Sequence, residues 1–283
     1  MYSQKAPARL DATAAIDVTR LGVVSFLNTL PIIHGLEKRD DLMLDRAVPS
    51  GLVDRVISGQ VDVGMCSSID YLRSPEPLKI LRVAPLTCNG RTLTVRVFST
   101  VPLEEARHIH CDTDSHTSVA LLRILLKDHW KVDPDIVEFD TRVHHEQWPE
   151  TVMLIGDKVV QNAPSEDTHS CQADLGQIWK DMTGLPFVFA LWMARQDACD
   201  QLLAHVTETL SASLERNLDN LDELILEHAD AHGWPVALAA EYLNGLIKYQ
   251  LGNNELEGLR TFHGLAVSHG LVDEARPLDI FEH

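Results

Sequence analysis

Asn28 and Thr29 are the first residues whose position suggests chemistry, because they end an apolar, strand-forming segment at residues 21–26. Pro31 follows and favours the first turn of a helix, which the sequence predicts over 32–38 with Asn28 or Thr29 as its N-cap. Ligands of open α/β sheets bind beyond the carboxyl ends of the strands, and the free N–H groups of a helix start attract anions. We therefore expect Asn28 at a site for a negatively charged ligand; a plain capped turn is the alternative that fits the same residues.

Polar residues also follow three other predicted strands. A strand at 61–66 precedes two adjacent serines, which could bind the ligand or only cap a turn. A strand at 108–112 leads to a polar cluster in which Asp114 or Ser115 should cap an apolar helix. A strand at 151–155 ends in a Gly-Asp pair, which could face a cleft or cap a helix. The substrate-binding candidates from these junctions are Ser68, Ser115, His116, Thr117, Ser118, Gly156 and Asp157.

Strands and helices alternate along the chain with short connections, which is typical of a parallel sheet covered by helices. The predicted class is α/β with two lobes, a cleft between the lobes and a helical C-terminal region. We expect a discontinuous first lobe at 20–98 plus 187–283, a second lobe at 99–186 and a loose N-terminal tail at 1–19. The crossing segments near 95–99 and 187–191 would be the hinges. Because pockets favour clefts between lobes, we expect the ligand there.

The composition limits the function classes. A net charge of −18 argues against nucleic acid or an anionic membrane surface as a partner. Residues 1–19 lack the apolar core of a secretory signal, and no apolar run is long enough to span a membrane. Five scattered cysteines without a C-x-x-C motif predict reduced thiols and a cytoplasmic location. His108 and His110 would share a strand face, but no Cys or carboxylate motif accompanies them, so we expect no metal site.

Several motifs occur in a distinctive order. They read Val-Ser-Phe-Leu-Asn-Thr-Leu-Pro at 24–31, Gly-Gln-Val-Asp-Val-Gly at 59–64, Asp-Ser-His-Thr-Ser-Val-Ala-Leu-Leu-Arg at 114–123, Leu-Ile-Gly-Asp at 154–157 and Thr-Gly-Leu-Pro-Phe-Val-Phe-Ala-Leu-Trp at 183–192. Together they resemble the chorismate dehydratase (MqnA) family of the futalosine route to menaquinone. The resemblance implies a type II periplasmic-binding-protein-like fold that is used for catalysis.

The family's reaction removes water from chorismate and gives 3-[(1-carboxyvinyl)oxy]benzoate. The resemblance therefore implies a hydro-lyase, a small dicarboxylate substrate and no metal or organic cofactor. Chorismate is a dianion whose ring becomes aromatic when it loses the C3 hydrogen and the C4 hydroxyl. A homodimer is one assembly that the sequence allows.

The resemblance also assigns residue roles. Asn28 and Thr94 are expected to be catalytic, and Ser25 and Arg91 join the substrate-binding candidates. Thr94 stands where the family's Gly-Pro-Val-x-Ser motif has its Ser; here that motif reads Gly-Arg-Thr-Leu-Thr at 90–94, so the hydroxyl is kept and a methyl group is added. His116 stands where the family often has Arg, and a protonated imidazole could supply part of that charge.

The proton acceptor must be sought elsewhere, because neither Asn28 nor Thr94 is a strong base. The candidate protein bases are His34, His116 and Asp157. Our hypothesis is that the substrate's own enolpyruvyl carboxylate takes the ring proton while Asn28 and Thr94 orient it, so that geometry supplies much of the rate.

Two other function classes stay open: a solute-binding protein that only captures an anion, and a cytoplasmic ligand-sensing domain of the same fold. The lack of an export signal weakens the first, and the lack of a helix-turn-helix or basic segment before Arg20 weakens the second. A sister enzyme, 1,4-dihydroxy-6-naphthoate synthase, usually starts with Ser-Pro-Cys-Pro-Asn-Asp, which this chain does not have.

Overall fold

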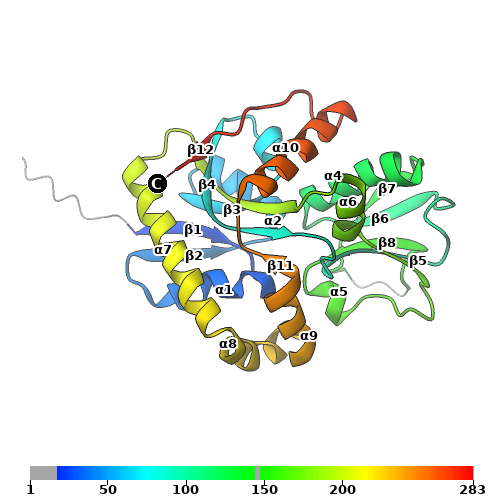
Figure 1. Ribbon diagram of the computed structural model, residues 1–283, viewed down its shortest axis with the longest axis horizontal. Coiled ribbons are helices and arrows are strands. Elements are labelled where there is room, and N and C mark those ends of the chain that lie inside the picture. The colour runs from blue at the N-terminus through cyan, green and yellow to red at the C-terminus, as the bar shows by residue number, and fades with distance from the viewer. Residues whose placement is uncertain (1–17, 144–146, 283) are drawn as a thin grey trace, which may run out of the picture.

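The computed structural model describes residues 18–143 and 147–282, and within these ranges the strands form two sheets of seven and five strands. Figure 1 shows the two sheets side by side, each in its own lobe. The tail expected at 1–19 lies outside the described residues up to residue 17, and Thr19 already belongs to the first strand.

The first sheet has the order β11-β4-β10-β3-β1-β2, with β12 beside β4. Strands β1, β2 and β3 are parallel, and β10 runs antiparallel between β3 and β4. Strand β3 is buried at all five positions, as expected for a strand covered on both faces. The strand bounds are β1 Thr19–Val23, β2 Leu42–Arg46, β3 Val63–Ser67, β4 Leu78–Cys88, β10 Phe187–Arg195, β11 Ile247–Lys248 and β12 Ile280–Phe281.

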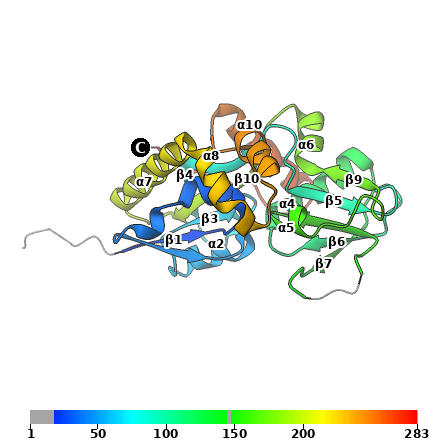
Figure 2. The ribbon, with the colours of Figure 1, turned by 90° about the horizontal axis from the view of Figure 1, so that it is seen from below.

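Helices cover both faces of this sheet, and β1 shows the division. Leu21 and Val23 belong to a buried cluster with helices α1 (Leu30–Ile33), α7 (Asp200–Asp219) and α8 (Leu221–His228). Gly22 faces the other way, against α2 (Pro49–Ile57), where a Cβ atom would come within 2.8 Å of the Leu52 side chain. Figure 2 shows α2 and α7 on opposite sides of the sheet. A second buried cluster continues from α2 through α10 (Asn253–Ser268) into the second lobe.

The second sheet has the order β7-β6-β8-β5-β9. Strand β6 is parallel to β7 and β8, and β5 is antiparallel to β8 and β9. Its elements are β5 Val95–Ser99, β6 His108–Asp112, α4 His116–Leu125, β7 Asp135–Phe139, β8 Thr151–Ile155, α5 Lys158–Gln161, β9 Cys171–Asp174 and α6 Leu175–Thr183. As expected, Ser115 caps α4, because its hydroxyl accepts a hydrogen bond from the Ser118 N–H at 3.2 Å.

The chain crosses between the lobes through residues 89–94 and again from α6 into β10. The expected placement of a crossing at Val95–Ser99 was wrong, because β5 pairs along its length inside the second sheet. One carboxylate holds both crossings: Asp174 caps α6 and also accepts hydrogen bonds from the N–H groups of Thr92 at 3.0 Å and Leu93 at 2.7 Å. Asp174 therefore holds the segment that leads to Thr94 through the backbone N–H groups of that segment.

The C-terminal region is helical but less regular than its composition predicts. Helix α9 (Val236–Glu241) passes into a π-helical turn at Tyr242–Leu246 and then into β11, within the C-terminal region that the sequence predicts to be helical. A short helix α3 (Asp70–Arg73) follows β3 in the first lobe. Over the described ranges, we find no helix with the combined length and apolarity that crossing a membrane requires.

Candidate functional site

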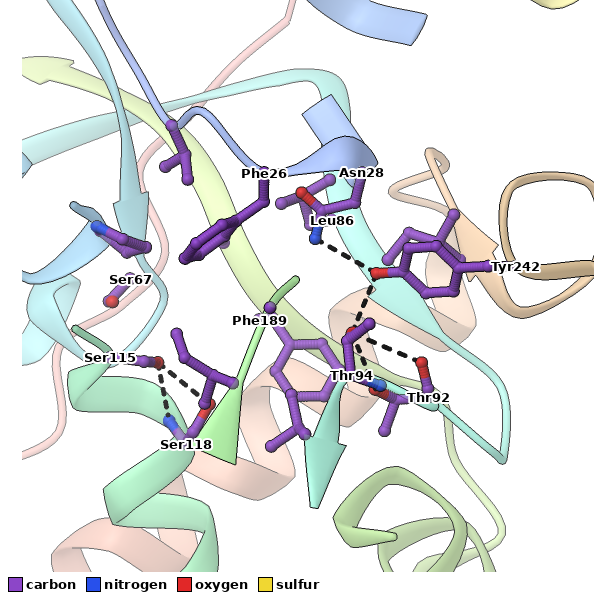
Figure 3. A pocket seen from close by; sticks show the side chains of 17 residues that line it. Phe26, Asn28, Ser67, Leu86, Thr92, Thr94, Ser115, Ser118, Phe189 and Tyr242 are labelled. Carbon is purple, nitrogen blue, oxygen red and sulfur yellow. Dashed lines mark hydrogen bonds between the residues drawn. The ribbon is translucent and has the colours of Figure 1, made fainter. Parts of the chain in front are cut away.

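A cavity lies where the two lobes meet, and both lobes line it. The first lobe supplies Phe26, Asn28, Ser67, Leu86, Phe189 and Tyr242; the second lobe and the crossing supply Thr92, Thr94, Ser115, Ser118 and Gly156. Figure 3 shows most of these side chains around the space. Among the residues that the structure describes, no Lys, Arg, His, Asp or Glu lines this cavity. Its polarity comes from hydroxyl and amide groups alone.

Asn28, Tyr242 and Thr94 form one chain of hydrogen bonds at the cavity wall. The Asn28 amide nitrogen donates to the Tyr242 phenol oxygen at 3.2 Å, and the phenol oxygen lies 2.9 Å from the Thr94 hydroxyl oxygen (Figure 3). The three residues are only 9%, 1% and 4% exposed, in that order. Burial raises the pKa of the Tyr242 phenol well above its usual value, against the opposing effect of its hydrogen bonds with Thr94 and Asn28. Tyr242 is therefore a neutral hydrogen-bonding group at physiological pH.

Two buried polar atoms of cavity residues have no hydrogen-bond partner in the described protein: the Asn28 side-chain oxygen and the Ser67 hydroxyl. Buried polar atoms are nearly always paired, and an exception in a native structure calls for an explanation. Polar groups of a bound ligand would supply hydrogen-bond partners for both atoms.

The route by which Asn28 reaches the cavity differs from the expected one. Residues Leu27–Thr29 form a 3₁₀ turn that passes into the four-residue helix α1; Thr29 stands at the N-cap position of α1, as the sequence allowed, but its side chain makes no capping hydrogen bond. The Thr29 hydroxyl instead turns back to the carbonyls of Val24 and Phe26, at 2.8 and 2.9 Å. The prediction of one helix over 32–38 was wrong: α1 ends at Ile33, Gly35 takes a φ of +84°, and a separate 3₁₀ turn follows at Leu36–Lys38. The distant Asn217 side chain donates to the Pro31 and His34 carbonyls, both at 3.0 Å, and holds this short helix. A helix of one turn also carries too small a dipole to attract an anion.

The second lobe offers a longer helix start. Helix α4 has ten residues, and both Ser115, its N-cap, and Ser118 line the cavity. Gly156 closes the same side, with a φ of +65°. A Cβ atom at Gly156 would lie 2.9 Å from the ring of Phe26 in the other lobe, so this position requires glycine for both its backbone conformation and its close approach.

Ser68 and Thr117, two predicted substrate-binding residues, lie beside the cavity without lining it. The Ser68 hydroxyl donates to the Val188 carbonyl at 2.7 Å, and Thr117 accepts from the Ile69 N–H at 3.2 Å. Both residues are fully buried, and their hydroxyl oxygens lie 3.4 Å apart. The structure therefore places them in the contact between the lobes.

The predicted cationic candidates also lie elsewhere. Arg91 is half exposed and pairs with Glu241 at 2.8 Å, and His116 Nδ1 lies 2.8 Å from an Asp70 oxygen. Ser25 is exposed, and with His34 it lines a separate pocket on the first lobe. In the described ranges, His, Cys, Asp and Glu side chains form no group of three that could hold a metal ion.

Asp157 is buried, and its carboxylate is hydrogen-bonded to three groups of the first lobe. Its carboxylate accepts hydrogen bonds from the Leu27 N–H at 3.1 Å, from the Trp234 indole at 3.0 Å and from His232 Nδ1 at 3.0 Å. It does not line the cavity. In this arrangement Asp157 joins the lobes, and its oxygens face protein donors rather than the ligand space.

The sequence did not single out Tyr242, Phe26 or Phe189 as ligand-facing, and of the two adjacent serines it selected Ser68 rather than Ser67. Tyr242 lies in a segment that reads as ordinary helix, and no local pattern distinguishes it. Strand β3 extends one residue further than predicted and ends at Ser67. That single residue decides which hydroxyl reaches the cavity.

Comparison with known proteins gives a consistent set of relatives. A sequence model of a family described as menaquinone biosynthesis matches residues 19–268. A chorismate dehydratase from Thermus thermophilus is 28% identical over 256 residues, which cover 86% of this chain and 93% of that protein.

Solved structures show the same fold at low identity. Protein AF1704 from Archaeoglobus fulgidus has a TM-score of 0.71 at 15% identity, covering 89% of this chain and 98% of its own. The alkanesulfonate-binding protein SsuA from Xanthomonas axonopodis pv. citri has a TM-score of 0.65 at 16% identity, covering 93% and 97%. A Candida albicans protein described as having the generic periplasmic binding protein fold has a TM-score of 0.58 at 10% identity, covering 92% of each chain. The expected two-lobed fold is confirmed.

Proposed function

Because the chain belongs to the menaquinone biosynthesis family, we propose that it is a chorismate dehydratase, which converts chorismate to 3-[(1-carboxyvinyl)oxy]benzoate. The observation that carries the proposal is the cavity between the lobes, in which Asn28 and Thr94 are joined through Tyr242 in one hydrogen-bond chain. The Thermus relative, named for this reaction, supports the same reading.

The main task of the protein in this reaction is to orient the substrate. Loss of the C3 hydrogen and the C4 hydroxyl makes the ring aromatic, so the products are strongly favoured. The protein must hold a dianion, align the hydroxyl that leaves and bring a base to the C3 hydrogen. Holding the reacting groups in such a geometry can supply a large part of the rate.

The uncharged cavity bears on the identity of the base. A cationic side chain beside a carboxylate lowers the carboxylate's pKa, whereas burial among neutral groups raises it. The described cavity lining offers hydroxyl and amide groups and no cation, so a substrate carboxylate bound there would remain basic. We propose that the enolpyruvyl carboxylate removes the C3 proton and that the proton then accompanies the leaving hydroxyl as water.

The protein groups have complementary roles in this scheme. The unpaired Asn28 oxygen can accept a hydrogen bond from the C4 hydroxyl, and the Thr94 hydroxyl can donate to the carboxylate that acts as base. Ser115 and Ser118, at the start of α4, suit the second carboxylate. The rings of Phe26 and Phe189 keep water away from the reacting groups.

The test is incubation of the purified protein with chorismate, followed by chromatographic detection of the dehydrated aromatic product. We expect turnover by the natural chain and a loss of about 100-fold in kcat for Asn28→Ala and Thr94→Val, because both position the reacting groups. Arg91→Ala, on the exposed pair with Glu241, serves as the matched control and should retain turnover. Binding of chorismate without conversion would instead support a solute-binding or sensing protein.

A further inference from the structure

We infer that Tyr242 is a positioning residue that fixes which atoms Asn28 and Thr94 present to the substrate. The inference rests on the proposed function, because it explains how one amide and one hydroxyl acquire defined roles in the dehydration. Tyr242 lies on the π-helical turn after α9, far along the chain from both partners, and its ring reaches the wall of the cavity (Figure 3).

The direction of the hydrogen bonds carries the argument. An amide can present either its oxygen or its nitrogen to the cavity, and the two choices differ by a half-turn of the side chain. Here the Asn28 nitrogen donates to the phenol oxygen at 3.2 Å, which leaves the amide oxygen as the buried atom of this cavity residue that has no partner in the described protein. A phenol that accepts from Asn28 still has its own hydrogen to donate, and the Thr94 oxygen lies 2.9 Å away.

This arrangement also bears on the role of Thr94. If Thr94 accepts the phenol hydrogen, its own hydroxyl hydrogen, which has the Thr92 carbonyl oxygen 3.5 Å away as an acceptor in the structure, can be donated to a substrate oxygen instead. The site then presents an acceptor at Asn28 and a donor at Thr94. The opposite chain, with a rotated amide, would present a donor at Asn28 and an acceptor at Thr94, which would reverse the match to a leaving hydroxyl and a carboxylate.

The Tyr242 ring is itself held in place. The indole of Trp234 stacks on it, with ring centroids 5.0 Å apart and an angle of 20° between the planes. The same indole donates to Asp157 of the second lobe at 3.0 Å. Contact between the lobes therefore supports the phenol that orients Asn28 and Thr94.

The kinetic test compares Tyr242→Phe with Tyr71→Phe. Tyr71 is a matched control, because its buried phenol also makes two hydrogen bonds, to the Pro277 carbonyl and the Asp279 N–H, at a different place in the fold. Tyr242→Phe should lower kcat about 100-fold with little change in KM, since it disturbs orientation rather than ligand capture. Tyr71→Phe should leave kcat unchanged even where it lowers the unfolding midpoint. Equal losses of kcat in both variants, or no loss in Tyr242→Phe, would overturn the inference.

A second arm uses coupling between residues. If Tyr242 acts through Asn28, then Tyr242→Phe added to Asn28→Ala should lower kcat no further than Asn28→Ala alone. Additive losses would show that the phenol acts independently of the amide, which contradicts the inference.

A third arm does not depend on catalysis. In protein labelled with ¹⁵N-asparagine, Tyr242→Phe should shift the Asn28 side-chain amide signal and speed its exchange with water, whereas Tyr71→Phe should not. An unchanged Asn28 signal overturns the positioning role. If the natural chain fails to convert chorismate while the Asn28 signal responds as expected, the proposed function fails and the positioning role stands.

Discussion

Ser67 and Ser68 are chain neighbours with opposite environments. The Ser67 hydroxyl is buried, unpaired and part of the cavity lining, whereas the Ser68 hydroxyl donates to the Val188 carbonyl at 2.7 Å. Leaving a buried hydroxyl unpaired costs about 1–3 kcal/mol, so Ser67 carries a cost in the empty protein that a ligand can relieve. Of these two adjacent residues, Ser67 should therefore affect ligand binding and Ser68 should affect stability.

We predict opposite results for the two alanine variants. Ser67→Ala should leave the free energy of unfolding unchanged or slightly raised, and should raise the KM for chorismate about tenfold through loss of one hydrogen bond. Ser68→Ala should lower the free energy of unfolding by about 1–2 kcal/mol with little effect on KM. Urea unfolding and steady-state kinetics measure both quantities. The reverse pattern would show that Ser68 is the ligand-facing serine.

At the scale of elements, the turn between β8 and α5 connects the lobes through Asp157. Its carboxylate accepts hydrogen bonds from the Leu27 N–H, which begins the 3₁₀ turn after β1, and from the Trp234 indole and the His232 imidazole, all on the first lobe. Three donors around one carboxylate stabilise the contact between the lobes, and they leave neither carboxylate oxygen free to abstract a proton.

Asp157→Asn tests this assignment. The amide offers one acceptor oxygen and places an NH₂ group against the remaining donors, so the contact between the lobes should weaken. We expect KM to rise by about tenfold or more, a larger change than in kcat, and a larger radius of gyration by small-angle X-ray scattering. Loss of kcat with normal KM and unchanged dimensions would point to Asp157 as a protein base.

The elements that could be predicted from sequence are those that local residues determine. Apolar segments with polar ends predicted the two lobes, and the Ser115 cap predicted the start of α4. The π-helical turn at Tyr242 and the one-turn helix α1 could not be predicted, because contacts with distant segments decide them. The same division holds among the cavity-lining residues: Asn28, Ser115 and Gly156 follow strands, so the sequence could propose them, whereas Tyr242 has no local signal.

At the scale of the whole molecule, His263 links the C-terminal helix α10 to the first sheet. Its Nε2 lies 3.1 Å from the Ser68 carbonyl, so the neutral imidazole donates there. Burial lowers the pKa of His263 to about 4, with the hydrogen bond to Ser68 acting in the opposite direction. The folded protein therefore resists protonation at a position where the unfolded chain would accept a proton near pH 6.5.

This difference predicts a pH dependence of stability. Between pH 6.5 and 4 the unfolded state binds more protons at His263, so the free energy of unfolding falls as the pH falls. Above pH 6.5 the stabilisation from His263 is fully present, and about 3 kcal/mol of it is lost by pH 4. Urea unfolding at several pH values measures this dependence. Between pH 6.5 and 4, the free energy of unfolding should change less with pH in His263→Gln than in the natural chain. Parallel curves would mean that His263 does not govern this range.

The position of Tyr242 along the chain has a consequence for synthesis. Tyr242 follows Asn28 by 214 residues and Thr94 by 148, so both sheets have been almost fully translated before it leaves the ribosome. A nascent chain that already has two lobes still lacks the phenol that orients the amide. Premature termination after α8 would therefore remove the phenol together with α10, which completes the buried cluster that extends into the second lobe.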